Sequence, residues 1–331
     1  YINSNDKKAS LLKIKSGSVL DINGTNSHLV TRIMGGGKFR TATPDIPAAD
    51  YGEFVNNDTA VFEYYGGDYT IGSSLSTYPT LWIAGDGAPV KTLPDQDILV
   101  NDDLKIGDLG SAGATLQMGQ TGNMEVLDSL QLQNGGGLAF QAGASGVNTV
   151  TVNSSVDMNA DQAATDTEIA INAAPSAANP HQLILQRDVM MGSGTMTLWT
   201  GDGNRGVDLY FEGDSSATVT APLDGSDQLA LNYLFIDKAT VNDTLFMRSD
   251  FTLTDNTNKT LLLQGGAFRV DNAGIDVSLS SGDGDFEIPG TSALIMDAGR
   301  MEITGSNTGL FLNGPLVLNN SSRMILDDGN D

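Results

Sequence analysis

Carboxylates are the residues of this chain whose types and spacing best suit chemistry. Asp95, Asp97, Asp102 and Asp103 lie close together in the sequence, and residues 282–285 spell Gly-Asp-Gly-Asp. Two or three carboxylates in a cleft suit a glycoside hydrolase, whereas clustered carboxylates with a Lys or Arg base suit a calcium-dependent polysaccharide lyase. Both groups fall in predicted turns, where Asp is favoured for backbone reasons. A carbohydrate-active enzyme is therefore the alternative hypothesis, and we assign no catalytic residue.

A ligand-like segment follows Trp199. It holds Asp202, Asn204 and Arg205 in the run Gly-Asp-Gly-Asn-Arg-Gly. An aromatic ring, oxygen ligands and a guanidinium together suit a sugar, so these four residues are candidate glycan contacts. The run lacks the bidentate Glu of an EF-hand calcium loop. The competing interpretation is a tight turn beside a half-buried tryptophan.

Other common site chemistries find no support in the sequence. The chain has no cysteine, which excludes disulfides, thiolate catalysis and cysteine-based zinc sites. Its two histidines, His28 and His181, have no acidic or nucleophilic neighbour that would suggest a triad. The triple glycines at 35–37 and 135–137 do not lead into a predicted helix, so we interpret them as corners rather than phosphate-binding loops. We predict no cofactor and no metal residue; a structural calcium ion fits the acidic turns but does not follow from them.

Charge and hydropathy limit the partners. The formal net charge is −24 and the pI is about 4.1, which disfavours binding to nucleic acid or anionic lipid. No apolar run approaches the ~18 residues of a membrane-spanning helix, and the first residues do not resemble a signal peptide. Because the chain begins and ends within its repeat pattern, we expect it to be a segment of a longer protein.

Short apolar doublets pervade the sequence and must position all of these residues. In each doublet one residue separates two apolar side chains, the spacing that directs both toward one face of a strand. Turn-forming Gly, Asn, Asp, Ser and Pro separate the doublets. The clearest run is Leu294/Met296, Met301/Ile303, Leu310/Leu312, Leu316/Leu318 and Met324/Leu326. A doublet returns after 22 residues from Leu294 to Leu316, which indicates a chain that winds and stacks on itself.

The predicted fold is therefore an all-β parallel β-helix, or β-solenoid. Crossover handedness favours right-handed winding, and coils of this length favour three faces. At ~25 residues per coil the chain would make about thirteen coils. We expect residues 1–331 to form one continuous solenoid, with loop excursions near 41–57 and 173–180.

Residues 51–106 resemble a unit of giant secreted and surface adhesins of Bacteroidota. The resemblance lies in Gly52-Glu53-Phe54-Val55, in the strand from Val61 to Gly67, and in Tyr69-Thr70-Ile71, and it continues through 78–83, 91–93 and 99–106. Residues 88–90 depart from the usual Gly-Ser-Gly. The resemblance implies type IX secretion cargo of the gliding-motility adhesin type, located extracellularly or on the cell surface. The secretion machinery would act through a region outside this segment.

The resemblance also implies O-glycosylation at Asp-Ser/Thr-aliphatic triplets, which assigns Thr59, Ser129 and Thr244 as candidate sites. The expected function is a non-enzymatic stiff stalk or display surface of a large adhesin. Expected partners are a surface polysaccharide or another cell-surface protein. The alternative is a carbohydrate-active β-helix enzyme or a glycan-binding module.

Overall fold

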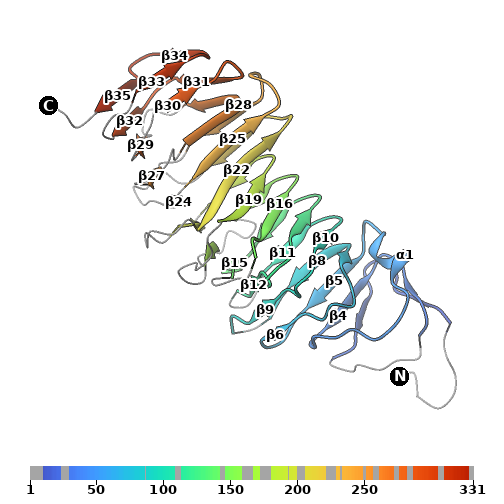
Figure 1. The fold of residues 1–331 in the computed structure, drawn as a ribbon. Coiled ribbons are helices and arrows are strands. Elements are labelled where there is room, and N and C mark those ends of the chain that lie inside the picture. Colours follow the sequence, from blue (N-terminus) through green and yellow to red (C-terminus); the bar gives the residue numbers. More distant parts are fainter. Residues whose placement is uncertain are drawn as a thin grey trace.

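The chain winds into a β-solenoid of parallel stacked strands (Figure 1). In the computed structural model, the described residues are 10–23, 30–85, 87–108, 113–141, 146–158, 167–171, 180–192, 194–199, 206–220, 229–231, 233–248, 251–255, 261–271, 276–281, 286–304 and 309–327. Every strand pairing among them is parallel, and each joins a strand to its counterpart one coil away. The predicted all-β parallel solenoid is confirmed.

Three faces run along the solenoid, as predicted. The β2–β34 face contains β2 (Val19–Asp21), β4 (Lys38–Thr41), β5 (Val61–Tyr64), β8 (Thr80–Ile83), β11 (Leu104–Ile106), β14 (Leu130–Leu132), β17 (Val156–Asp157), β20 (Val189–Met190), β23 (Ala217–Thr220), β26 (Thr244–Met247), β28 (Leu261–Val270), β31 (Ser292–Met296) and β34 (Leu316–Leu318). The β7–β28 face contains β7 (Thr77–Tyr78), β10 (Ile98–Val100), β13 (Met124–Val126), β16 (Thr149–Val152), β19 (His181–Leu185), β22 (Val207–Gly213), β25 (Leu234–Lys238) and β28, which turns a corner and belongs to both faces.

The β6–β35 face contains β6 (Tyr69–Thr70), β9 (Val90–Thr92), β12 (Thr115–Gln117), β15 (Gly137–Phe140), β18 (Glu168–Ile171), β21 (Thr195–Thr197), β24 (Leu229–Leu231), β27 (Phe251–Asp255), β29 (Asp276–Ser281), β32 (Arg300–Thr304) and β35 (Arg323–Asp327). Two small pairs complete the fold: β1 (Leu12–Lys13) with β3 (Ile33–Met34), and β30 (Phe286–Ile288) with β33 (Leu310–Leu312).

The coil count differs slightly from the predicted thirteen, because the solenoid has about nine turns. Nine register steps lead from β8 to β34 on the β2–β34 face, and three further steps lead from β2 to β8. Coil length also varies, which a uniform estimate ignores. Phe62 pairs with Leu81, 19 residues later, whereas Val156 pairs with Val189, 33 residues later. The predicted right-handed winding stays a prediction.

Inward-pointing doublets form one core, which is why these segments fold as strands. The buried hydrophobic residues make a single cluster that extends from Ile14 to Ile303. In β13, for example, Met124 and Val126 are buried while Glu125 between them is exposed. Register partners stack inward residue on inward residue, so that Leu104 lies beside Leu130 and Leu130 beside Val156. Each coil therefore covers the apolar side chains of its neighbours.

The predicted loop excursion at 41–57 is not a plain loop. It contains the short helix α1 (Gly52–Val55), and its aromatic side chains are buried. Tyr51 lies edge-on to Phe39 at 5.8 Å, and Phe54 lies edge-on to Phe62 at 5.9 Å. The N-terminal core is therefore richer in aromatic side chains than the later core. The second predicted excursion, 173–180, lies outside the described residues except for Pro180.

Glycine corners let successive coils approach closely. Gly107 has a φ of +101°, and a Cβ there would lie 1.9 Å from the carbonyl oxygen of Gln133 in the next coil. Gly35 and Gly135, from the triple glycines, also have positive φ. Their interpretation as corners is confirmed. α1 has only four residues, and no described helix has the length and hydropathy needed to span a membrane.

Candidate functional site

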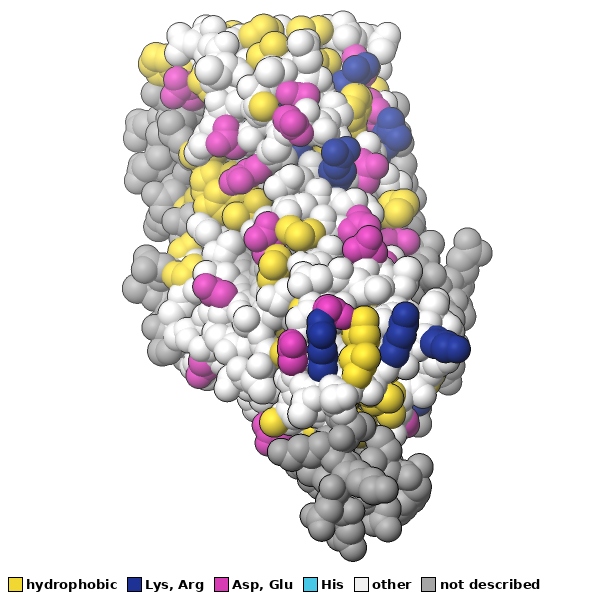
Figure 2. All heavy atoms as spheres, turned by 90° about the vertical axis from the view of Figure 1, so that its right-hand side faces the viewer, with side chains coloured by type: hydrophobic (Ala, Val, Ile, Leu, Met, Phe, Trp, Pro, Cys, Tyr) yellow, Lys and Arg dark blue, Asp and Glu magenta, His cyan; other side chains and the backbone are white. Residues whose placement is uncertain are grey.

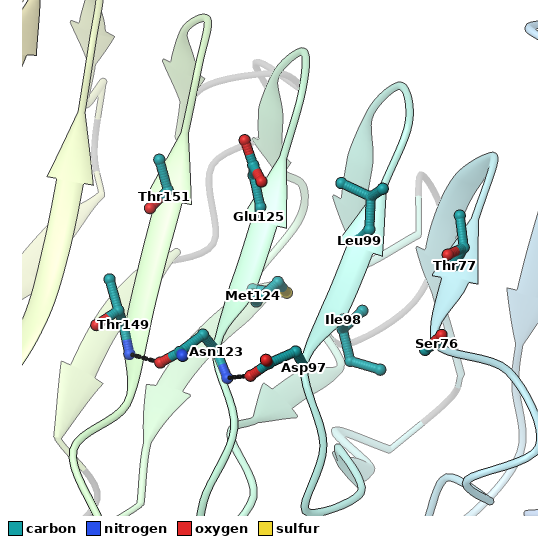
Figure 3. A pocket seen from close by; sticks show the side chains of 10 residues that line it. All are labelled: Ser76, Thr77, Asp97, Ile98, Leu99, Asn123, Met124, Glu125, Thr149 and Thr151. Atoms are coloured by element: carbon teal, nitrogen blue, oxygen red, sulfur yellow. Dashed lines mark hydrogen bonds between the residues drawn. The ribbon is translucent and has the colours of Figure 1, made fainter.

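A shallow groove of about 540 Å³ on the outside of the β7–β28 face is the best-defined candidate site. It extends across β7, β10, β13 and β16, which present four successive coils to solvent (Figure 3). Both polar and apolar side chains line it: Ser76, Thr77, Asp97, Ile98, Leu99, Asn123, Met124, Glu125, Thr149 and Thr151.

Strand register creates two parallel rows of side chains in this groove. Leu99, Glu125 and Thr151 are register partners and form the outward row. Asp97 and Asn123 belong to a second row at the start of the strands, where side chains accept hydrogen bonds from the next coil. The backbone N–H of Asn123 donates to Asp97 Oδ1 at 2.9 Å. The same contact recurs one coil later, where the backbone N–H of Thr149 donates to Asn123 Oδ1 at 2.9 Å. Together the two hydrogen bonds fix the lower edge of the groove (Figure 3).

Several groove side chains are also held from outside it. The Asn153 side-chain amide donates to Glu125 Oε1 at 3.0 Å, and the Thr149 hydroxyl donates to Gln182 Oε1 at 3.2 Å. Among the described residues, no side chain or backbone group hydrogen-bonds the Thr151 hydroxyl. The groove thus offers two carboxylates, an amide and hydroxyl groups in ordered positions beside the apolar surface of Leu99. Such a mixture suits a hydroxyl-rich ligand.

An acidic triad lies in the corners that follow the groove strands β10 and β13. Carboxylate oxygens of Asp102, Asp103 and Asp128 lie within 4.8 Å of one another. Burial raises the pKa of Asp103, and Lys105, whose ammonium lies 3.3 Å away, lowers it. The Thr80 hydroxyl donates to Asp102 Oδ2 at 2.8 Å. These donors satisfy part of the triad, and the calcium hypothesis stays a prediction.

Basic side chains gather near the N-terminal end of the β2–β34 face (Figure 2). There Lys38 and Arg40 both contact the buried carboxylate of Glu63, at 2.6 Å and 3.1 Å. The Lys38 ammonium also lies 3.7 Å from the ring centre of Trp82, whose Nε1–H donates to the Gly107 carbonyl. Because each cation is paired within the protein, this cluster stabilises neighbouring coils rather than offering free charge to a partner.

The predicted sugar-contact segment is only partly placed. Trp199 is half-buried just after β21, whereas Asp202, Asn204 and Arg205 lie outside the described residues. The same holds for His28 and for the acidic turn at 282–285. Of the sequence-predicted acidic residues, Asp97 lines the groove, and Asp102 with Asp103 contributes to the triad.

The three candidate glycosylation sites occupy different environments. Thr59 is exposed, and Ser129 is half-buried with its hydroxyl 3.1 Å from that of Ser155. Thr244 is buried, with 8% of its surface exposed, at the start of β26. A glycan at Thr244 would need the strand to open, so this placement disfavours that site. Exposure favours Thr59, and the modification itself stays a prediction.

His181 occupies a buried structural position rather than a reactive one. It stacks on Phe140 at 5.6 Å, and its Nδ1 accepts a 2.9 Å hydrogen bond from the backbone N–H of Asn148. This bond places the proton of the neutral ring on Nε2. Burial lowers the pKa of His181, so the neutral form is favoured.

Sequence reasoning missed most of the groove. Glu125 and Thr151 lie between the two apolar residues of a doublet, and that middle position points outward on both of their strands. Aligning the coils by their doublets would have placed Leu99, Glu125 and Thr151 in one row. It would not have shown which outward row is hollow.

Comparison of the chain with protein-family models, with curated proteins and with solved structures gives no match.

Proposed function

We propose that this chain is a non-enzymatic structural and adhesive segment of a large extracellular protein, acting as a stiff stalk that displays binding surfaces. The main support is the uninterrupted stacking of coils. Parallel ladders continue along all three faces, and one apolar core extends from Ile14 to Ile303. Bending such a rod would stretch backbone hydrogen bonds on one face and disturb core packing at the same time.

Side chains that join coils add to the stiffness. Arg248 pairs with Asp271 of the next coil at 3.0 Å, and the buried Lys91 donates to backbone carbonyls of the preceding coil. Neither contact serves an obvious binding purpose. Both resist separation of neighbouring coils, which is what a load-bearing stalk needs.

Adhesion would use the outward surfaces. The acidic surface of the molecule, with its net charge of −24, keeps copies apart and disfavours anionic partners. A surface polysaccharide or another cell-surface protein is the proposed partner. Secretion by the type IX route and a role in gliding belong to the same proposal and rest on the resemblance of residues 51–106 alone.

A carbohydrate-active enzyme is the second candidate, and one observation favours it: Asp97 and Glu125 line the same groove. A screen of the purified chain on neutral and acidic polysaccharides separates the two hypotheses. The stalk function predicts no release of reducing ends and no unsaturated uronate products. Turnover that is lost in Asp97→Asn or Glu125→Gln would establish the enzyme instead.

A further inference from the structure

The groove continues along the rod into an apolar row. From Thr151 the register partners on the outward side of the β7–β28 face are Ile184, Tyr210, Phe235 and Leu262, all half-buried. Polar side chains therefore line the first part of one outer face, and apolar side chains follow on the same line. A ligand that extends along the rod would meet both.

Aromatic geometry shapes this apolar row. The rings of Tyr210 and Phe235 are parallel within 8°, with centroids 4.3 Å apart. Their faces cover each other, so their edges form a continuous apolar ridge rather than two separate platforms. The apolar face of a sugar ring can pack on such a ridge while its hydroxyl groups reach polar side chains. Gln182, which lies 3.5 Å from the Tyr210 hydroxyl, provides an amide beside the ridge.

Coil spacing sets the repeat that a ligand must match. Neighbouring strands are about 4.8 Å apart, so equivalent side chains recur at that interval along the rod. One sugar ring of an extended polysaccharide spans a comparable length. A linear glycan could therefore place successive rings over successive coils.

Charge decides which glycans fit. Asp97 and Glu125 line the groove, and the whole molecule is strongly acidic. Uronates and sulfated sugars would meet like charge, whereas neutral sugar hydroxyls can donate hydrogen bonds to these carboxylates. We infer that this face binds a neutral, extended polysaccharide along the rod axis, over the groove and the Tyr210–Phe235 ridge. The inference rests on the proposed adhesive function and names its ligand class and surface.

Affinity gel electrophoresis with soluble polysaccharides tests the inference. The probes are a linear β-glucan and a linear mannan, with polygalacturonate as the acidic counterpart. We expect at least one neutral probe to retard the chain and polygalacturonate to leave its mobility unchanged. The double variant Glu125→Gln/Thr151→Ala should bind the retained probe about tenfold more weakly, because it loses one charged and one neutral hydrogen-bonding group. Thr151→Trp should block the groove and abolish binding.

Gln117→Ala is the matched control, because Gln117 lies on β12 in the same part of the rod but on the β6–β35 face. It should keep wild-type mobility. Thermal unfolding confirms that each variant is folded. The inference would be overturned if neither neutral probe retarded the chain, or if polygalacturonate retarded it equally. It would also be overturned if Gln117→Ala lost as much affinity as the groove variants. Each of these results would leave the stalk function in place. Release of reducing ends would instead overturn the proposed function.

Discussion

The side-chain ammonium of Lys238 donates a 2.7 Å hydrogen bond to the backbone carbonyl of Gln186, which lies two coils earlier. It also donates to the carbonyl of Glu212 in the intervening coil. One buried lysine thus ties three successive coils together at a corner, where turning strands leave carbonyl groups without ladder partners. Lys91 makes the same kind of contact with Gly66 at 2.8 Å near the other end of the rod.

Replacing this tie should weaken the fold. Lys238→Met keeps most of the buried side-chain volume but leaves two carbonyl groups without their donor. We expect the free energy of unfolding to fall by about 2 kcal/mol, the usual cost of unsatisfied buried acceptors. Urea denaturation followed by circular dichroism measures it. Lys13→Met, at an exposed position of β1, is the control and should change stability little. Equal stability of Lys238→Met and the wild type would show that the tie contributes nothing.

Alkaline pH should strengthen the contribution of the buried lysines. Burial lowers the pKa of Lys238 to about 8, below its ordinary value of 10.5. Between those values the unfolded chain binds more protons than the folded chain, so the free energy of unfolding rises with pH. The stability difference between the wild type and Lys238→Met should therefore grow from pH 8 to pH 10. A difference that shrinks over this range would contradict a Lys238 pKa that burial lowers.

Corner glycines should tolerate substitution according to how closely the next coil approaches. Gly107→Ala must place a Cβ against the carbonyl of Gln133 and adopt positive φ, whereas Gly17→Ala pays only for the φ of +76°, because its Cβ meets nothing within 4 Å. Left-handed backbone costs about 1–2 kcal/mol for a residue with a Cβ. The free energy of unfolding should fall by about that much in Gly17→Ala and by clearly more in Gly107→Ala. Chemical denaturation of both variants compares them, and equal losses would mean that the coils are not in contact at this corner.

Acidic pH should reduce the contribution of His181 to stability. Its pKa is lowered by burial, and protonation of Nδ1 would break the hydrogen bond from Asn148. Below the ordinary pKa of about 6.5 the unfolded chain binds the proton more readily, so the contribution of His181 to stability falls as pH falls. The wild type should therefore lose stability relative to His181→Gln between pH 7 and pH 5. Taking the difference cancels the opposite contributions of Asp103 and Glu212, whose pKa values burial raises. A pH-independent difference would contradict the account.

Sequence patterns predicted the core well and the surface poorly. Doublets such as Leu294/Met296 and Met301/Ile303 are buried as expected, because period-two spacing leaves few other arrangements for strands this short. The last three doublets of the same run differ from the prediction, since Leu312, Leu318 and Leu326 are exposed. The buried ties at Lys91 and Lys238 could not be predicted, since lysine is almost never fully buried and its sequence neighbours are unremarkable. The groove depends on which outward residues become register partners. Coils of unequal length conceal that register in the sequence.

Distances along the rod test the central claim most directly, and the absence of cysteine makes the measurement clean. Two double-cysteine variants can be spin-labelled, one with cysteines in place of Lys105 and Thr220 and one with cysteines in place of Lys105 and Asn319. Strand register places position 220 four coils and position 319 eight coils from position 105. At about 4.8 Å per coil, the backbone separations are about 19 Å and 38 Å, so electron–electron double resonance should give a distance that roughly doubles. Equal or inverted distances for the two pairs would contradict a single stacked rod, and with it the stalk function.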